Sequence, residues 1–244
     1  MRDKVYILGV GIDNLTEGET LQRMEEFIES GTPHQVVTVN PEFLVVAQED
    51  HQFKKVLDEA DLAIPDGVGL LWAARLLGKP LKGRVTGVEL VRSLAKLAEK
   101  RGYRIFLLGA REGVAQAAAK VLQDESPNLV IAGTYAGSPT LEEEGGIVER
   151  ISAARPHMLF VAYGFPQQDV WIRRNMNRMS VPMSMGVGGA FDYISGTVKR
   201  APAWMRRLGL EWLFRLVRQP WRWRRILRLP RFVWLVLRSA KPER

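Results

Sequence analysis

Polar side chains recur in this chain at the points where short apolar runs end. Asp66 follows one such run directly after Pro65, and Thr38 and Asn40 lie at the end of another. A carboxylate beside apolar walls holds its proton more tightly than one in water, as a general base requires. Thr38 and Asn40 project from the same side of an extended chain, so both could contact one ligand. Asp66 or Asn40 could instead act only as a helix N-cap, and at Asn40 capping and ligand binding are compatible.

Glycines stand beside polar side chains after two later apolar runs. Gly164 begins the segment that contains Gln168, and Gly188 belongs to a glycine cluster that leads to Asp192. Glycine lets a flat or charged ligand approach the backbone closely, and a carboxylate can accept a hydrogen bond from a base or a sugar hydroxyl. We therefore expect both segments to line a ligand site.

Two weaker signals concern anions. Gly109 and Ala110 form a small-residue turn after an apolar run, where backbone N–H groups could face a phosphate. Arg84 stands in a loop between Gly83 and Gly87, where its guanidinium could pair with phosphate or carboxylate. Many α/β turns resemble the first signal, and a solvated loop arginine accounts for the second, so neither identifies a phosphate site by itself.

Apolar runs alternate with segments of helical period as far as residue 198. Continuous apolar strands, each followed by a helix, are typical of a parallel sheet covered on both faces. We therefore predict an α/β fold with a doubly wound, mostly parallel, Rossmann-like sheet. The expected strands are Val5–Val10, Gln35–Val39, Asp61–Ile64, Arg104–Leu108, Leu129–Ala132, Met158–Tyr163 and Pro182–Val187. The expected helices include Glu17–Ser30, Glu42–Asp50, Gly67–Leu77, Val88–Arg101, Gly113–Asp124, Leu141–Ala154 and Gln167–Met179.

Two of these helices begin with the spacing of a capping box. Thr16 stands three residues before Glu19, and Thr140 stands three residues before Glu143. In this arrangement the Thr hydroxyl and the Glu carboxylate each bind a free N–H group of the first helical turn. We predict a capping box at both helix starts.

The charge of the chain is divided unevenly between two parts. The 244 residues include 35 Lys and Arg and 27 Asp and Glu, for a net charge of +8. From Lys199 to Arg244 there are 14 basic and two acidic residues, so this segment carries +12 and residues 1–198 carry −4. The same segment holds five of the seven Trp. We predict an α/β domain over residues 1–198 and a basic, Trp-rich helical appendage over residues 199–244.

The appendage has the composition of a segment that lies on a membrane surface. Its longest apolar run, Phe232–Leu237, is far shorter than the ~20 residues that span a bilayer. From Trp204 to Leu216 a Trp or Leu recurs every four residues beside arginines, and three prolines, the last of them Pro230, divide the segment into short helices. A nucleic acid is an alternative partner, although the apolar stripe favours an anionic lipid surface. Exposed Trp side chains also leave a homo-oligomer open.

Several reaction types lack the residues that they need. The chain has no Cys, and its three His are scattered without metal-ligand spacing, so we expect no disulfide, metal site or Cys nucleophile. The G-x-x-x-x-G-K-[ST] and G-x-S-x-G motifs are absent. Asn14 stands where a dinucleotide fingerprint beginning at Gly9 needs glycine, which counts against a nicotinamide-dependent dehydrogenase. No secretion signal begins the chain, so we expect a protein made in the cytosol.

Taken in order, the motifs resemble those of the WecG/TagA/CpsF family of glycosyltransferases over essentially the whole chain. In Gln167-Gln168-Asp169, where the family more often has Lys, Gln and Glu, the Asp keeps the charge on a shorter side chain. The resemblance is carried by Thr38-Val39-Asn40-Pro41, Pro65-Asp66-Gly67, Arg84-Val85-Thr86-Gly87, Leu108-Gly109-Ala110, Gly164-Phe165-Pro166-Gln167-Gln168, Gly186-Val187-Gly188-Gly189-Ala190-Phe191-Asp192, Arg200-Ala201-Pro202 and Gly209-Leu210-Glu211-Trp212.

This resemblance implies an inverting enzyme that works without a metal or cofactor. It would move N-acetylmannosamine from a UDP-sugar to undecaprenyl-diphosphate-linked N-acetylglucosamine at the inner face of the cell membrane, in synthesis of the wall teichoic acid linkage unit. A uronic acid or another hexose is the alternative donor. The implied catalytic base is Asp66, with Thr38 and Asn40 beside it. The implied substrate-binding residues are Arg84, Gly109, Ala110, Gly164, Gln168, Gly188 and Asp192, and the arginines expected at the diphosphate and the membrane are Arg215, Arg222 and Arg225.

Overall fold

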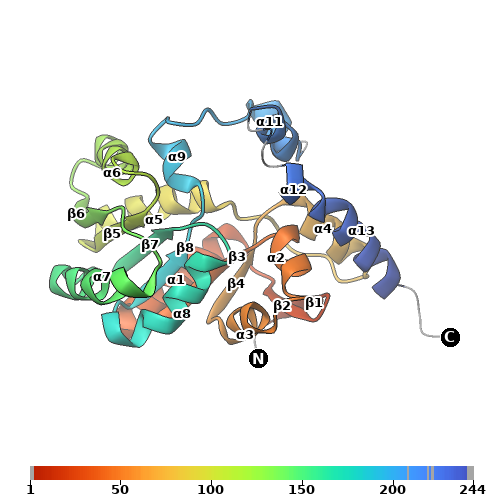
Figure 1. Ribbon diagram of the computed structural model, residues 1–244, viewed down its shortest axis with the longest axis horizontal. Helices are drawn as coiled ribbons and strands as arrows, with labels where there is room; N and C mark the ends of the chain where they lie inside the picture. Colours follow the sequence, from red (N-terminus) through yellow and green to blue (C-terminus); the bar gives the residue numbers. More distant parts are fainter. Residues whose placement is uncertain (1–2, 208, 219, 221–222, 241–244) are drawn as a thin grey trace.

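Six parallel strands form the central sheet of the protein. The computed structural model describes residues 3–207, 209–218, 220 and 223–240 (Figure 1). The strand order is β4-β3-β8-β7-β5-β6, so the chain winds outward to one edge and then to the other before it returns to the middle. The prediction of a doubly wound, parallel α/β fold is confirmed. The strands are β3 (His34–Val39), β4 (Leu62–Pro65), β5 (Arg104–Gly109), β6 (Val130–Tyr135), β7 (Met158–Ala162) and β8 (Met183–Gly186).

Helices cover both faces of this sheet, and their apolar sides form the core. Every residue of β7 is buried, as expected of a strand that is covered on both faces. One face is covered by α1 (Glu17–Ser30), α5 (Gly87–Arg101), α6 (Val114–Glu125) and α9 (Ala190–Ile194). The other face is covered by α7 (Leu141–Ala154) and α8 (Gln167–Met179). Beside the edge strand β4 lie α2 (Pro41–Val46), α3 (His51–Glu59) and α4 (Val68–Leu76).

The first predicted strand is wrong. Residues Val5–Val10 do not join the main sheet, because the chain reverses within them to pair β1 (Lys4–Ile7) with β2 (Val10–Asp13) in an antiparallel hairpin. Leu8 and Gly9 both have positive φ, at 50° and 75°, as two-residue hairpin turns require. Gly9, with which a dinucleotide fingerprint would have begun, therefore belongs to a hairpin turn.

The structure confirms one of the two predicted capping boxes. Thr16 and Glu19 bind each other's backbone N–H groups at the start of α1. Thr140 makes no side-chain cap. The Glu143 carboxylate accepts instead from the N–H of Ser138 at 3.1 Å, and the Thr140 side chain forms a hydrogen bond with Glu142. The predicted helix Glu42–Asp50 is also shorter than expected, since α2 ends at Val46 and the Asp50 side chain caps a new helix, α3.

The described part of the appendage consists of short helices, as predicted, although Pro220 is the one proline of the three that lies between two of them. The helices are α10 (Ala203–Arg207), α11 (Glu211–Arg218), α12 (Trp223–Ile226) and α13 (Arg228–Ser239). Gly209 separates α10 from α11 with φ of 73°, so Trp204 and Trp212 lie on different helices and the predicted stripe is interrupted; Leu208 lies outside the described residues. Pro230 does not divide two helices but lies in the first turn of α13, where a missing N–H costs nothing.

The last helix of the appendage completes the hydrophobic core next to β4. Figure 1 shows α13 beside α2 and α4. Phe232 and Val236 on its inner side are 2% and 0% exposed, and the Phe232 ring lies against Gly69 of α4. The appendage therefore shares a core with the α/β domain through α13. None of the helices in the described part of the chain is long and apolar enough to cross a membrane.

Replacing Phe232 by Ala should lower the free energy of unfolding by about 3 kcal/mol, because it leaves a cavity in a closed core. Chemical unfolding followed by circular dichroism measures this loss. Val233→Ala is the matched control, since Val233 is the adjacent residue and is 39% exposed. Equal stability of the two variants would contradict a structural role for α13.

Candidate active site

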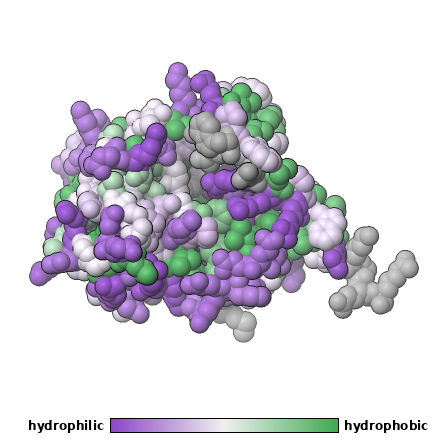
Figure 2. All heavy atoms as spheres, viewed as in Figure 1, coloured by the Kyte–Doolittle hydropathy of each residue, from purple (hydrophilic) through white to green (hydrophobic). Residues whose placement is uncertain are grey.

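The carboxyl ends of four neighbouring strands open into one cavity. Its volume is about 580 Å³, which suits a ligand of nucleotide-sugar size. Strands β3, β4, β7 and β8 supply one side, and residues of α11 and α12 supply the opposite side. In Figure 2, hydrophilic and hydrophobic side chains adjoin over this part of the surface. Ligands of open parallel sheets bind at this edge, so we take the cavity as the candidate active site.

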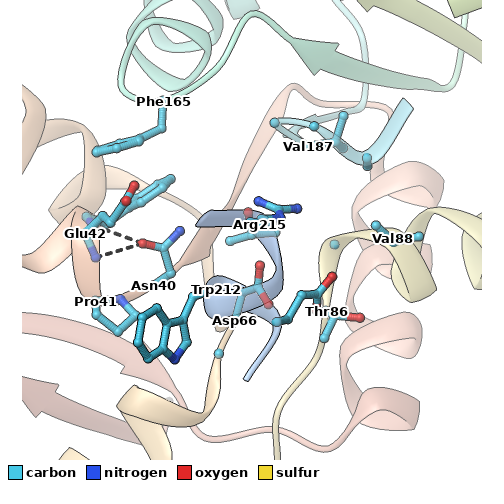
Figure 3. A pocket seen from close by; sticks show the side chains of 18 of the residues that line it. Asn40, Pro41, Glu42, Asp66, Thr86, Val88, Phe165, Val187, Trp212 and Arg215 are labelled. Carbon is cyan, nitrogen blue, oxygen red and sulfur yellow. Dashed lines mark hydrogen bonds between the residues drawn. The ribbon is translucent and has the colours of Figure 1, made fainter. Parts of the chain in front are cut away.

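Asp66 lies half-buried at the end of β4. Its N–H donates to the carbonyl of Val39 at 2.7 Å, which joins the ends of β4 and β3. Burial raises the pKa of Asp66 to about 6, while the cations of Arg215 and Arg84 act in the opposite direction. Figure 3 shows the carboxylate with Arg215 above it and Thr86 beside it. A carboxylate with this pKa is ionised at neutral pH and accepts a proton more readily than an exposed Asp.

Thr38 and Asn40 occupy the end of β3, as predicted. The Thr38 hydroxyl donates to the carbonyl of Gly186 at 3.3 Å and so ties β3 to β8. The Asn40 side-chain oxygen accepts from the N–H groups of Glu42 and Phe43 at 2.9 and 3.2 Å, which confirms its role as N-cap of α2. Its amide nitrogen lies on the other side from these bonds, within the lining of the cavity (Figure 3). Capping thus turns the amide nitrogen of Asn40 toward the cavity.

The ends of β7 and β8 contribute the glycines of the site. Gly164 and Gly188 have φ of 80° and 53°, and both line the cavity. The Gln168 side-chain oxygen accepts from the N–H of Gly188 at 2.9 Å, so α8 holds the segment after β8. Asp192 also lines the cavity and lies 3.7 Å from Arg111.

Two predicted residues lie outside the lining of this cavity. The N–H of Ala110 donates to the carbonyl of Ala162 at 3.1 Å and is therefore engaged within the protein. A Cβ at Gly109 would lie 2.9 Å from the Ala162 backbone, so glycine serves close packing there. Any contact of Gly109 or Ala110 with a substrate stays a prediction.

Appendage arginines reach the cavity from the side opposite the sheet. The Arg215 guanidinium lies 4.6 Å from the centre of the Tyr193 ring. Arg225 binds both carboxylate oxygens of Glu42, the closer at 2.6 Å. Both arginines line the cavity, whereas Arg222 lies outside the described residues. The appendage thus places two of the three predicted cations at the site.

Sequence reasoning did not single out several residues that line the cavity, among them Glu42 and Thr86. Glu42 orients Arg225 from α2, and no local pattern relates two residues so far apart in the chain. Thr86 precedes α5 without capping it, and its buried hydroxyl has no hydrogen-bond partner among the residues described. Its position three residues before Glu89 resembles a capping box and could have drawn attention to it.

The site combines a carboxylate of raised pKa with arginines that can bind an anion. Among the residues placed in the structure, no three His, Asp or Glu side chains are grouped as a metal ion would require. A base beside cations that can bind an anion, at the carboxyl edge of a doubly wound sheet, is typical of an enzyme that transfers a group from a nucleotide-linked donor.

Comparison with known proteins identifies the family. Residues 5–244 match the model of the Glycosyl transferase WecG/TagA/CpsF family, and the chain belongs to that family. It is 37% identical over 209 residues to a Bacillus subtilis protein named N-acetylglucosaminyldiphosphoundecaprenol N-acetyl-beta-D-mannosaminyltransferase, covering 86% of this chain and 81% of that protein. A Staphylococcus aureus protein of the same name is 34% identical over 243 residues, 99% of this chain and 94% of its own length.

Replacing Arg215 by Gln should raise the pKa of Asp66 above its value of about 6, because the cation that favours the ionised carboxylate is lost. Carbon-13 NMR titration of the Asp carboxyl groups measures the change. Arg218→Gln on the same helix is the matched control, since its guanidinium lies over the Phe214 ring. An unshifted Asp66 in Arg215→Gln, or an equal shift in both variants, would contradict this electrostatic role.

Proposed function

We propose that this protein transfers N-acetylmannosamine from UDP-N-acetylmannosamine to undecaprenyl-diphosphate-linked N-acetylglucosamine. The observation that carries the proposal is the Asp66 carboxylate, whose pKa is raised to about 6, in a cavity that appendage arginines close. The names of the Bacillus and Staphylococcus relatives favour this donor and acceptor. The alternative donor carries a uronic acid as its sugar. Its extra carboxylate would need an additional cation near the sugar.

In the proposed reaction Asp66 removes the proton from an acceptor hydroxyl. The hydroxyl oxygen then attacks the anomeric carbon, and the bond between that carbon and the β-phosphate oxygen breaks. UDP leaves with the bonding electrons, and the configuration at the anomeric carbon inverts because the hydroxyl oxygen attacks from the face opposite the departing UDP. Thr38 and Asn40, which flank Asp66 at the neighbouring strand end, are placed to orient the sugars for this attack.

Arginines supply the positive charge that the departing diphosphate needs. Arg215 is close enough to Asp66 to lower its pKa, so it lies near the reacting atoms. Arg225 lines the same cavity, where Glu42 holds its guanidinium. Fixed cations stabilise developing negative charge without a metal ion. We assign the same role to Arg222, on the strength of the family resemblance alone.

The donor lies, in this proposal, along the glycine-rich ends of β7 and β8. Gly164 and Gly188 leave room for the ligand, and Asp192 is placed to accept from a ribose or base. Gln168 supports this segment through its bond to Gly188. Arg84 faces the donor from the opposite loop.

Exposed aromatic side chains of the appendage favour binding at a membrane surface. Trp204, Trp223 and Trp234 are more than half exposed although Trp is usually buried. Trp72 of α4, beside α13, adds exposed apolar surface from outside the appendage. Arginines near such side chains attract anionic lipid. We infer that the protein binds the inner face of the cell membrane peripherally, where its lipid-linked acceptor resides.

Asp66→Asn should reduce turnover by at least a thousandfold while UDP binding persists, because the amide cannot take the acceptor proton but leaves the donor site in place. Transfer from a panel of UDP-sugars to a short-chain lipid-diphosphate N-acetylglucosamine measures turnover, and calorimetry measures UDP binding. Asp58→Asn, an exposed carboxylate paired with Lys54 on α3, is the control. Near-normal turnover of Asp66→Asn would refute the assignment of the base, and stabilisation by NAD in place of UDP would refute the donor class.

The triple substitution of Trp204, Trp223 and Trp234 by Ser should weaken binding to anionic vesicles at least tenfold, because three interfacial anchors are lost. Vesicle co-sedimentation measures this effect, and point variants are preferable to truncation because α13 belongs to the core. Tyr6→Ser, which removes an aromatic ring that is 62% exposed on β1, is the control. Unchanged vesicle binding, or equally tight binding to single-stranded DNA at physiological salt, would contradict the lipid role.

A further inference from the structure

A buried carboxyl group lies directly behind the candidate active site. Asp169, in the first turn of α8, has no exposed surface. Its carboxylate oxygens make no hydrogen bond of full geometric quality among the described residues, and the side-chain donor that acts on them is the amide of Gln168. A carboxyl group in such surroundings costs folding energy that an apolar side chain of similar size would not. This cost suggests a role beyond packing.

The Asp169 carboxyl group shares one small space with the Gln168 amide. A Cβ added to Gly186 would lie 2.5 Å from Asp169 Oδ1 and also 2.5 Å from Gln168 Nε2. The two atoms are therefore at most twice that distance apart, on the same side of Gly186 at the end of β8. Glycine at position 186 is what allows both polar groups to lie there.

The oxygen of the Gln168 amide binds the segment after β8, which forms one wall of the cavity. Gln168 Oε1 accepts from the N–H of Gly188 at 2.9 Å, and Gly188 has a positive φ of 53°. A side-chain amide has one acceptor end and one donor end, so a reversed Gln168 would lose this bond. An acceptor beside Nε2 favours the observed orientation over the reversed one. Asp169 Oδ1 is placed to be that acceptor.

We propose that Asp169 is a positioning residue of this site. Its carboxyl group orients the Gln168 amide, and through that amide it holds the segment from Gly186 to Gly189 in the shape that receives the sugar nucleotide. The buried carboxyl has a pKa raised to about 7 by desolvation, and the Gln168 amide acts in the opposite direction, toward the ionised form. The identity of the ligand rests on the proposed function, whereas the hold on Gly188 does not.

The test replaces Asp169 by Leu, which fills the space without an acceptor, and separately by Ala and by Asn. Amide hydrogen exchange of Gly188, measured by NMR on the unliganded protein, should rise at least tenfold in the Leu and Ala variants. The KM for the UDP-sugar should rise about tenfold in the same variants, the equivalent of one hydrogen bond. Asp169→Asn, which keeps one acceptor oxygen, should restore both values to near those of the parent protein.

Stability separates positioning from a structural role. Asp169→Leu should keep or raise the melting temperature while it impairs the site, because it removes a carboxyl group whose burial costs folding energy. Gln168→Leu should produce the same KM effect, and the double variant Gln168→Leu/Asp169→Leu should be no worse than Gln168→Leu alone. The matched control is Ser184→Ala, which removes a buried hydroxyl on β8 that has no hydrogen-bond partner among the described residues. It should change neither the exchange rate of the Gly188 amide nor the KM.

Two results would overturn the proposal. One is unchanged Gly188 exchange in the variants of Asp169 that fold. The other is an additive loss in the double variant, which would mean that Asp169 does not act through Gln168. If the parent protein neither binds UDP nor transfers sugar, the proposed function fails, while the exchange data still decide whether Asp169 holds Gly188.

Discussion

The cost of ionising a carboxylate away from water governs the arrangement of this site. Asp66 emerges from a buried strand, and burial raises its pKa to about 6. The cations of Arg215 and Arg84 offset part of that cost, so the side chain is ionised at neutral pH and still takes up a proton readily. Because Arg215 belongs to the appendage, the proton affinity of Asp66 depends on a helix that lies outside the α/β fold.

The appendage therefore has two physical roles. Phe232 and Val236 anchor α13 in the core, whereas Arg215 and Arg225 close the cavity above the sheet. The exposed Trp side chains on the same helices leave an apolar surface for a partner. In the proposed function a lipid-linked acceptor would reach the cavity from that side. Membrane attachment, closure of the cavity and charge compensation at Asp66 would then all depend on the helices α10 to α13.

Local patterns predicted the elements well wherever local physics decides them. The alternation of apolar runs and helices predicted the parallel sheet, and Thr16 and Asn40 cap their helices as their residue types indicate. Prediction failed where a competing contact was available. The capping box predicted at Thr140 does not form, since the Glu143 carboxylate binds the N–H of Ser138 and the Thr140 side chain binds Glu142. The run at Val5–Val10 looked like a sheet strand, but positive φ at Leu8 and Gly9 reverses the chain.

The sequence by itself determined the fold class, the strand ends on which the site is built and the uneven charge. These follow from residue periodicity, from the shared edge of parallel strands and from composition. Only the tertiary structure decided how Glu42 binds Arg225, how Arg215 lowers the pKa of Asp66 and how Asp169 meets Gln168. The first two depend on groups far apart in the chain, and the third on the space at Gly186. Charge compensation and hydrogen bonding act over a few ångströms, so packing decides which groups meet.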